Sequence, residues 1–108
     1  MASIKDKKVE QQIKDLAGDF LVRHSNRSSL ITVTNVILSP DNKRADILVS
    51  VLPVASERTA LLFCNRLKQD FREYMMNHSR FRIIPSVYFR ADEGEKNRQR
   101  ISELLETE

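Results

Sequence analysis

Two nine-residue segments separated by a short polar corner limit most strongly what this chain can fold into. They read LITVTNVIL (residues 30–38) and RADILVSVL (residues 44–52), and both are rich in the β-branched residues that favour strands. The corner begins with SPDN, in which Pro40 fixes its own φ while Asp41 and Asn42 tolerate turn conformations. We therefore predict an antiparallel hairpin.

The alternation of apolar residues in the two strands differs. In the second, positions 45, 47, 49 and 51 share one face, as a half-buried strand requires. In the first, Ile31 and Val33 have one phase and Val36 and Leu38 the opposite one. One extra residue near positions 34 and 35 would bring all four to the core side, so we predict a β-bulge there.

Helical spacing of apolar residues occurs on both sides of the hairpin. It predicts one helix over about 4–24 and another over about 57–77, with Ser56 as a possible N-cap of the second. Pro85 then precedes a short predicted strand, SVYFR (residues 86–90), in which Val87 and Phe89 share one face and Tyr88 and Arg90 the other.

This order of elements predicts an α+β fold. A helix that crosses over the sheet in the right-handed sense makes the third strand parallel to the second, giving a three-stranded mixed sheet with the helices on one face. Residues 1–91 form one expected domain, followed by an acidic tail over residues 92–108. The tail contains a short amphipathic helical segment with Ile101, Leu104 and Leu105.

Composition limits the function classes. No apolar run approaches the ~18 residues needed to span a bilayer, and MASIKDKK lacks the apolar stretch of a secretory signal, so a cytoplasmic protein is expected. Cys64 is the only cysteine, and we interpret it as a buried thiol rather than a nucleophile. Asp41 lacks a base or second acid arranged beside it, which favours a structural role in the corner over catalysis. We expect no enzyme activity, metal or cofactor.

Charge is distributed unevenly along the chain. Residues 60–90 carry six basic and two acidic side chains, whereas residues 91–108 carry three basic and six acidic ones. A positive patch is what a phosphate-backbone partner requires, because each neutralised phosphate releases counterions. The alternative is a solvated surface whose charge is uneven for no functional reason.

Several short motifs, in this order and spacing, resemble the ribosome-binding factor A family. They are the Ser39–Pro40–Asp41 corner, Arg82-x-x-Pro85 before the last strand, an acidic stretch at Asp92 and Glu93, and the Ile101-x-x-Leu104–Leu105 tail. The resemblance covers about residues 9–106. Each motif alone is weak, and their combination is fairly specific.

The resemblance implies a type II K-homology-like fold and a non-enzymatic assembly factor. Such a factor binds the small (30S) ribosomal subunit, assists late maturation of its 16S ribosomal RNA and matters for growth in the cold. The implied partners are the small subunit and its RNA, with no membrane and no small-molecule substrate, and the protein is expected to be a monomer.

In this family an Ala-x-Gly kink breaks the second helix, in place of the backbone-clamping Gly-x-x-Gly loop of K-homology domains. The kink aligns with Leu67, Lys68 and Gln69, so its glycine is missing. Either the helix kinks without glycine, or it runs straighter and contacts RNA through side chains. We favour a weaker kink with Lys68 and Gln69 facing the ligand.

The candidate RNA contacts lie on the second helix, in the segment after it and at the corner. They are Arg66, Lys68, Gln69, Arg72, Arg80, Arg82, Lys43 and Arg44. Plain solvation explains any single basic residue on or after the helix about as well, and it explains Lys43 and Arg44 better, because charged turns are common. A protein-interaction module using exposed Leu48, Leu52 and Tyr88 is the alternative function. Tyr88 is also a candidate for stacking on a base, and helix dipoles suffice to explain His24 and His78.

Overall fold

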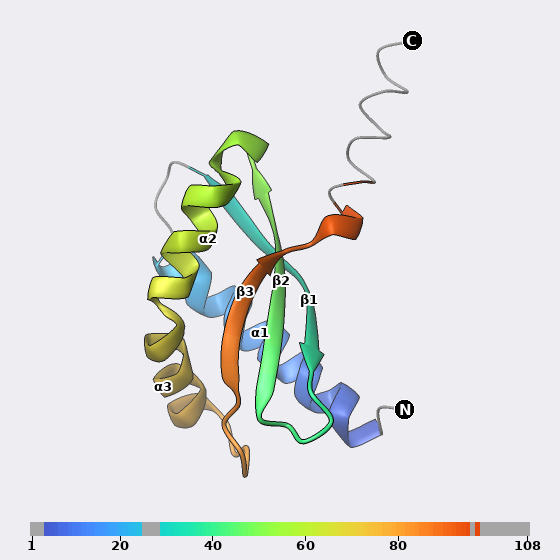
Figure 1. Ribbon diagram of the computed structural model, residues 1–108. Helices are drawn as coiled ribbons and strands as arrows, with labels where there is room; N and C mark the ends of the chain where they lie inside the picture. Colours follow the sequence, from blue (N-terminus) through green and yellow to red (C-terminus); the bar gives the residue numbers. More distant parts are fainter. Residues whose placement is uncertain (1–3, 25–28, 96, 98–108) are drawn as a thin grey trace.

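The computed structural model describes residues 4–24, 29–95 and 97, and Figure 1 shows their arrangement. The elements are α1 (Ile4–His24), β1 (Leu30–Leu38), β2 (Arg44–Leu52), a 3-10 turn η1 (Val54–Ser56), α2 (Glu57–Arg66), α3 (Lys68–His78) and β3 (Ser86–Ala91). The predicted bounds of the first helix and of the hairpin strands are confirmed, and the third strand is one residue longer than predicted.

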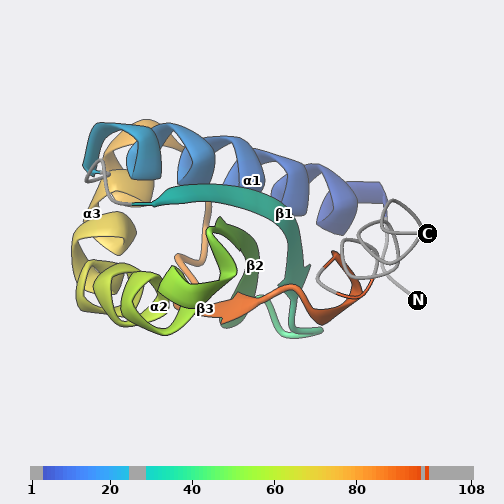
Figure 2. The ribbon, with the colours of Figure 1, turned by 90° about the horizontal axis from the view of Figure 1, so that it is seen from above.

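The three strands form one mixed sheet in the order β1-β2-β3. β1 and β2 pair antiparallel, with Leu30 opposite Leu52, and β2 and β3 pair parallel, with Arg44 opposite Ser86. In Figure 1 α1 lies behind the sheet while α2 and α3 lie beside β3, and Figure 2 shows the same arrangement from above. The predicted α+β fold, with its mixed sheet and a parallel third strand, is confirmed.

The predicted bulge is present in β1. The register shifts between Val33 and Asn35, leaving Thr34 as the extra residue. Its Oγ1 lies 3.2 Å from the Leu48 carbonyl oxygen and also hydrogen-bonds the Asp92 carboxylate. The extra residue thus brings the second half of β1 into phase with the core, where Val36 is buried.

The core lies between the helices and one face of the sheet. β2 buries its predicted face completely, and β3 buries Val87 and Phe89. The helices contribute Ile13, Ala17, Phe20, Leu21, Ala60, Cys64, Phe71 and Met75. On the opposite face Tyr88 and Arg90 are exposed, and Leu48 is half-buried. This open face of the sheet carries the polar residues discussed below.

The helix predicted over 57–77 is broken at Leu67. Leu67 has φ −91° and ψ 3°, and its N–H donates to the Cys64 carbonyl at 3.0 Å, one residue nearer than in a regular α-helix. The helical pattern resumes when the Phe71 N–H donates to the Leu67 carbonyl. Residues with a side chain adopt this conformation at negative φ, so the kink forms without glycine. The prediction that the helix kinks without glycine is therefore confirmed, while the orientation of Lys68 and Gln69 towards a ligand stays a prediction.

Ser56 occupies the predicted N-cap position of α2, but its side chain does not cap the helix. Ser56 has φ −90° and ψ 0°, because it completes η1 and its N–H donates to the Pro53 carbonyl at 2.9 Å. A capping side chain normally projects from extended backbone. Ser56 accordingly makes no side-chain hydrogen bond to the start of α2.

Two further expectations concern Cys64 and the tail. Cys64 is buried as predicted, and burial raises the pKa of its thiol from 9.0 to about 11. The start of the tail is joined to the sheet, since the Asp92 N–H donates to the Val49 carbonyl at 2.8 Å. Ile101, Leu104 and Leu105 lie outside the described residues.

Candidate nucleic-acid interface

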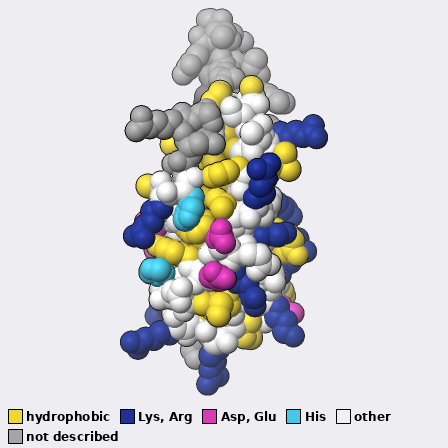
Figure 3. Space-filling view, turned by 90° about the vertical axis from the view of Figure 1, so that its left-hand side faces the viewer, with side chains coloured by type: hydrophobic (Ala, Val, Ile, Leu, Met, Phe, Trp, Pro, Cys, Tyr) yellow, Lys and Arg dark blue, Asp and Glu magenta, His cyan; other side chains and the backbone are white. Residues whose placement is uncertain are grey.

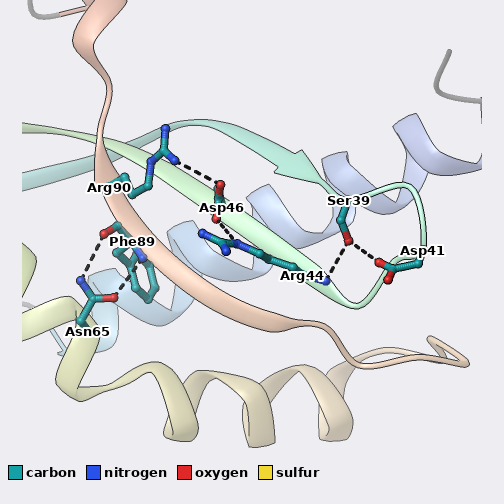
Figure 4. Close-up of polar contacts among 7 residues, drawn as sticks. All are labelled: Ser39, Asp41, Arg44, Asp46, Asn65, Phe89 and Arg90. Carbon is teal, nitrogen blue, oxygen red and sulfur yellow. Dashed lines mark hydrogen bonds and ion pairs between the residues drawn. The ribbon is translucent and has the colours of Figure 1, made fainter.

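The corner between β1 and β2 is organised by Asp41 and Ser39. Ser39 Oγ donates to Asp41 Oδ1 at 2.7 Å and accepts from the Arg44 N–H at 3.0 Å (Figure 4). The Lys43 N–H also donates to Asp41 Oδ1, at 3.1 Å. The bond from Ser39, followed by that from the Lys43 N–H, lowers the pKa of the Asp41 carboxyl below 3.8. The structural role predicted for Asp41 is confirmed. The next residue, Asn42, adopts the left-handed conformation of the turn, with φ 62°, which asparagine tolerates better than most residues.

Two of the predicted contact residues meet at Tyr88. The Arg44 guanidinium, from β2, lies 4.4 Å from the centre of the Tyr88 ring, and Lys68 Nζ, from the kink, lies 4.9 Å from it. Both distances are within the range of cation–π attraction. Tyr88 therefore holds a cation from the sheet and a cation from the helix over the open face; we call these three residues the Tyr88 cluster.

An acidic residue beside the cluster partly neutralises it. Asp46 Oδ1 lies 3.0 Å from Arg44 Nε, and Asp46 Oδ2 lies 3.3 Å from Arg90 Nη1 (Figure 4). Asp46 is opposite Tyr88 in the register of β2 and β3, which places it between the two arginines. Arg44 thus has both an ion pair and a ring contact, whereas Lys68 has no ion pair among the described residues.

The kink sets the position of Lys68, and Asn65 fixes the helix end before it. Asn65 Nδ2 donates to the Phe89 carbonyl at 3.1 Å, and Asn65 Oδ1 accepts from the Phe89 N–H at 3.0 Å (Figure 4). These two bonds join the last turn of α2 to the edge of β3. Lys68 follows directly after the kink residue and therefore lies close to Tyr88, the residue that precedes Phe89.

The other predicted residues on the helices and before β3 are exposed. Arg66 and Gln69 flank the kink, and Arg80 and Arg82 lie in the segment before β3. Arg72 Nη2 is 3.4 Å from the Ile84 carbonyl oxygen, so Arg72 also links α3 to that segment. No described contact joins the side chains of Arg80 and Arg82 to the Tyr88 cluster.

The corner and the segment before β3 lie at one end of the molecule. The Ser86 N–H donates to the Lys43 carbonyl at 2.9 Å, which joins them directly. Figure 3 shows Lys and Arg side chains at the right-hand side, the lower end and the left edge of the face that carries α2 and α3. Hydrogen bonds and ring contacts thus join the three sequence segments that carry the candidate contacts.

The surface required by a protein-interaction module is less apolar than the sequence indicated. Tyr88 is covered by two cations, Leu48 is half-buried, and Leu52 is exposed at the far end of β2. These three residues do not form an apolar patch on their own. The observation favours a charged ligand for the open face.

Sequence reasoning missed three residues that organise the site: Asp46, Asn65 and Arg90. Strand alternation does place Asp46 on the same face as Tyr88 and Arg90, and pairing β2 with β3 would have put them together. The role of Asn65 depends on the angle at which α2 approaches the edge of β3. Nothing in the local sequence pattern reports that angle.

Among the described residues, no group of three or more His, Cys, Asp or Glu side chains is arranged to hold a metal ion. None of the described helices is long and apolar enough to cross a membrane.

An α-β-β-α-kink-α-β order, with a mixed sheet and a basic kink beside its edge strand, defines a K-homology-like domain. The family model for ribosome-binding factor A matches residues 5–105. The chain therefore belongs to the ribosome-binding factor A family.

Individual relatives agree with this assignment. Ribosome-binding factor A from Fervidobacterium nodosum is 29% identical, over 94% of this chain and 86% of the relative. The crystal structure of ribosome-binding factor A from Thermus thermophilus superposes with a TM-score of 0.72 at 22% identity, over 79% of this chain and 93% of that one. A homology model of the Thermus thermophilus factor, fitted into an electron cryomicroscopy map of its complex with the 30S subunit, gives a TM-score of 0.68 at 23% identity. That alignment covers 77% of this chain and 90% of the fitted one.

Proposed function

We propose that this protein is a cytoplasmic ribosome assembly factor. It binds the small ribosomal subunit through its RNA and assists late maturation of the 16S ribosomal RNA, with its greatest importance in the cold. Family membership supports this proposal, as does the 30S complex described for the Thermus thermophilus relative. It acts by binding, without catalysing a reaction and without a cofactor.

The observation that carries the proposal furthest is the convergence of Arg44 and Lys68 on Tyr88. Phosphate contacts position a protein on RNA without reading sequence, and cations held in fixed positions do this best. The open face of the sheet leaves room for a bulky ligand, because the helices cover the other face. Arg66, Arg80 and Arg82 are also exposed, and we expect them to supply further phosphate contacts.

Sedimentation of cell extract through a sucrose gradient tests the binding. We expect the protein to migrate with free small subunits, and to be released steeply as salt rises, because phosphate neutralisation releases counterions. Binding that persists unchanged from low to high salt would point to an apolar interface with a ribosomal protein instead. Absence from small subunits at every salt concentration would contradict the proposal.

Depletion of the protein tests the maturation role. We expect precursor 16S ribosomal RNA to accumulate on small subunits, more strongly at low growth temperature. A plasmid copy of the natural sequence should reverse this accumulation. Normal 16S ends in depleted cells at every temperature would contradict this part of the proposal while leaving subunit binding intact.

A further inference from the structure

The C-terminal turns of α1 and α3 carry the same pattern, an aromatic residue followed four positions later by histidine. The pairs are Phe20 with His24 and Tyr74 with His78. The ring centres are 4.1 Å apart in the first pair and 3.9 Å apart in the second, with interplanar angles of 31° and 23°. Phe20 and Tyr74 are themselves 5.5 Å apart, so the four rings form a continuous row, which we call the histidine row.

Both imidazoles of the row have a fixed orientation. His24 Nδ1 is 2.9 Å from the Phe20 carbonyl oxygen, and His78 Nδ1 is 2.9 Å from the Tyr74 carbonyl oxygen. Because a carbonyl oxygen only accepts hydrogen bonds, each Nδ1 carries a proton. Nε2 of each ring remains available to an external ligand, since both histidines are exposed.

The row lies apart from the basic surface around the Tyr88 cluster. Figure 3 shows both histidines on the left of the face that carries α2 and α3, with acidic side chains between them and the basic right-hand side. Arg23 supplies a positive charge here, with its guanidinium carbon 5.8 Å from the centre of the Tyr74 ring. The row therefore has a buried ring and a half-buried ring at its centre, an exposed imidazole at each end and one cation beside it.

Helix dipoles explain why histidine is favourable at each helix end, but the dipole does not require the rings to stack. Stacking of exposed, flat side chains with a nearby cation is the arrangement that proteins use to hold unpaired bases. Among the described residues, Tyr74 is the only ring in contact with His78, and His78 itself is exposed at the end of α3.

We propose that the histidine row stacks an unpaired RNA base on the outer face of His78, with Arg23 directed towards the adjoining phosphate. This inference rests on the proposed function only in taking RNA as the ligand. It adds a second contact at the C-terminal end of α3, whereas Lys68 is at the N-terminal end of that helix. A single strand that reaches both residues would have to run along α3.

Tyrosine fluorescence tests the proposal, because the chain has two tyrosines and no tryptophan. In Y88F protein, Tyr74 is the only tyrosine and the row is intact. We expect a short oligoadenylate to change Tyr74 emission, whereas an abasic oligonucleotide of equal length should leave it unchanged after correction for absorbance. H78A in the same background should weaken the oligoadenylate response about tenfold. Equal responses to the two oligonucleotides would overturn the proposal.

A second measurement keeps the test valid if H78A proves unstable. The chain has two histidines, so the natural protein gives two Hε1 signals in nuclear magnetic resonance spectra, one from each ring. Base stacking should move the His78 signal upfield with oligoadenylate, and R23Q should weaken binding while retaining that shift. An unmoved His78 signal at a saturating oligonucleotide concentration would overturn the proposal.

Failure of the histidine-row proposal can be distinguished from failure of the proposed function. If Tyr74 and His78 do not respond while the protein still sediments with small subunits, the row proposal fails and the proposed function stands. If they respond while the protein never sediments with small subunits, the row binds RNA and the proposed function fails.

Discussion

Asn65 pairs with the backbone of Phe89 through both ends of its side-chain amide. It donates to the Phe89 carbonyl and accepts from the Phe89 N–H, at 3.1 and 3.0 Å. β3 is an edge strand, and this amide satisfies the two groups that a fourth strand would otherwise bond. The same two bonds fix the end of α2 immediately before the kink, and thus the start of α3 where Lys68 lies.

Replacing Asn65 with alanine should therefore weaken the fold. We expect Asn65→Ala to lower the free energy of unfolding by about 1–3 kcal/mol, because two half-buried backbone groups lose their partner. Urea denaturation measures this change. Gln69→Ala is the matched control, since Gln69 is an exposed amide in the first turn of α3 and its replacement should cost less than about 0.5 kcal/mol. Equal losses in the two variants would contradict the role given to Asn65.

The glycine found at the kink in other family members should not improve this chain. Gln69 lies in the first turn of α3, after the kink already formed at Leu67. Gln69→Gly should lower the free energy of unfolding by about 1 kcal/mol, because glycine is a poor helix former. Chemical denaturation of Gln69→Gly and Gln69→Ala side by side measures it. A more stable glycine variant would show that the present kink is strained.

Burial of Cys64 predicts two properties of its thiol. With its pKa raised to about 11, it should react with thiol reagents at neutral pH only when the chain unfolds. The unfolded thiol ionises near 9.0, so between pH 9.0 and about 11 the unfolded state loses a proton that the folded state keeps. Folding stability should fall as pH rises through this range.

Other groups also titrate at alkaline pH, so the contribution of Cys64 is found by comparing the natural protein with a variant that lacks the thiol. Cys64→Ala should be less stable overall, but its free energy of unfolding should fall less steeply with pH at alkaline pH. Urea denaturation at a series of pH values measures this dependence. Identical slopes in the natural and variant proteins would contradict the burial argument.

The corner at Asp41 should make folding stability fall as pH decreases, whereas burial of Cys64 should make it fall as pH increases. Since Ser39 and the Lys43 N–H lower the pKa of the Asp41 carboxyl below 3.8, the ionised form is favoured in the folded state. Its contribution to stability is present above pH 3.8 and is lost as pH falls through the lowered pKa. Asp41→Asn should therefore show a smaller fall in melting temperature on acidification than the natural protein. The effect is modest because the carboxylate is exposed.

The sequence was a good guide to local structure in particular places. Residue alternation predicted the bulge near positions 34 and 35, where the structure has it. Without the extra residue, the apolar side chains of one half of β1 would lie on the solvent face of the sheet. Helical periodicity, in contrast, continued through Leu67, since the kink changes backbone hydrogen bonds while keeping Cys64 and Phe71 on the buried side. Only the family resemblance indicated a break there.

The site was harder to predict because its contacts span distant segments. Charge alone identified Arg44 and Lys68 as candidates, but their meeting at Tyr88 depends on strand register and on the kink together. Charge counting also could not show that Asp46 pairs with Arg44, which makes Lys68 the less neutralised of the two cations. Similarly, the histidine row requires α1 and α3 to end side by side.

Binding of charge-reversed protein to purified small subunits tests the central claim most directly. The variant Arg66→Glu/Lys68→Glu reverses two cations at the kink, and Lys7→Glu/Lys8→Glu makes the same change in net charge at exposed positions of α1. After circular dichroism confirms that both are folded, we predict that the kink variant binds at least about tenfold more weakly than the α1 variant. Equal affinity of the two variants would contradict the assignment of the kink and the Tyr88 cluster as the RNA-binding surface.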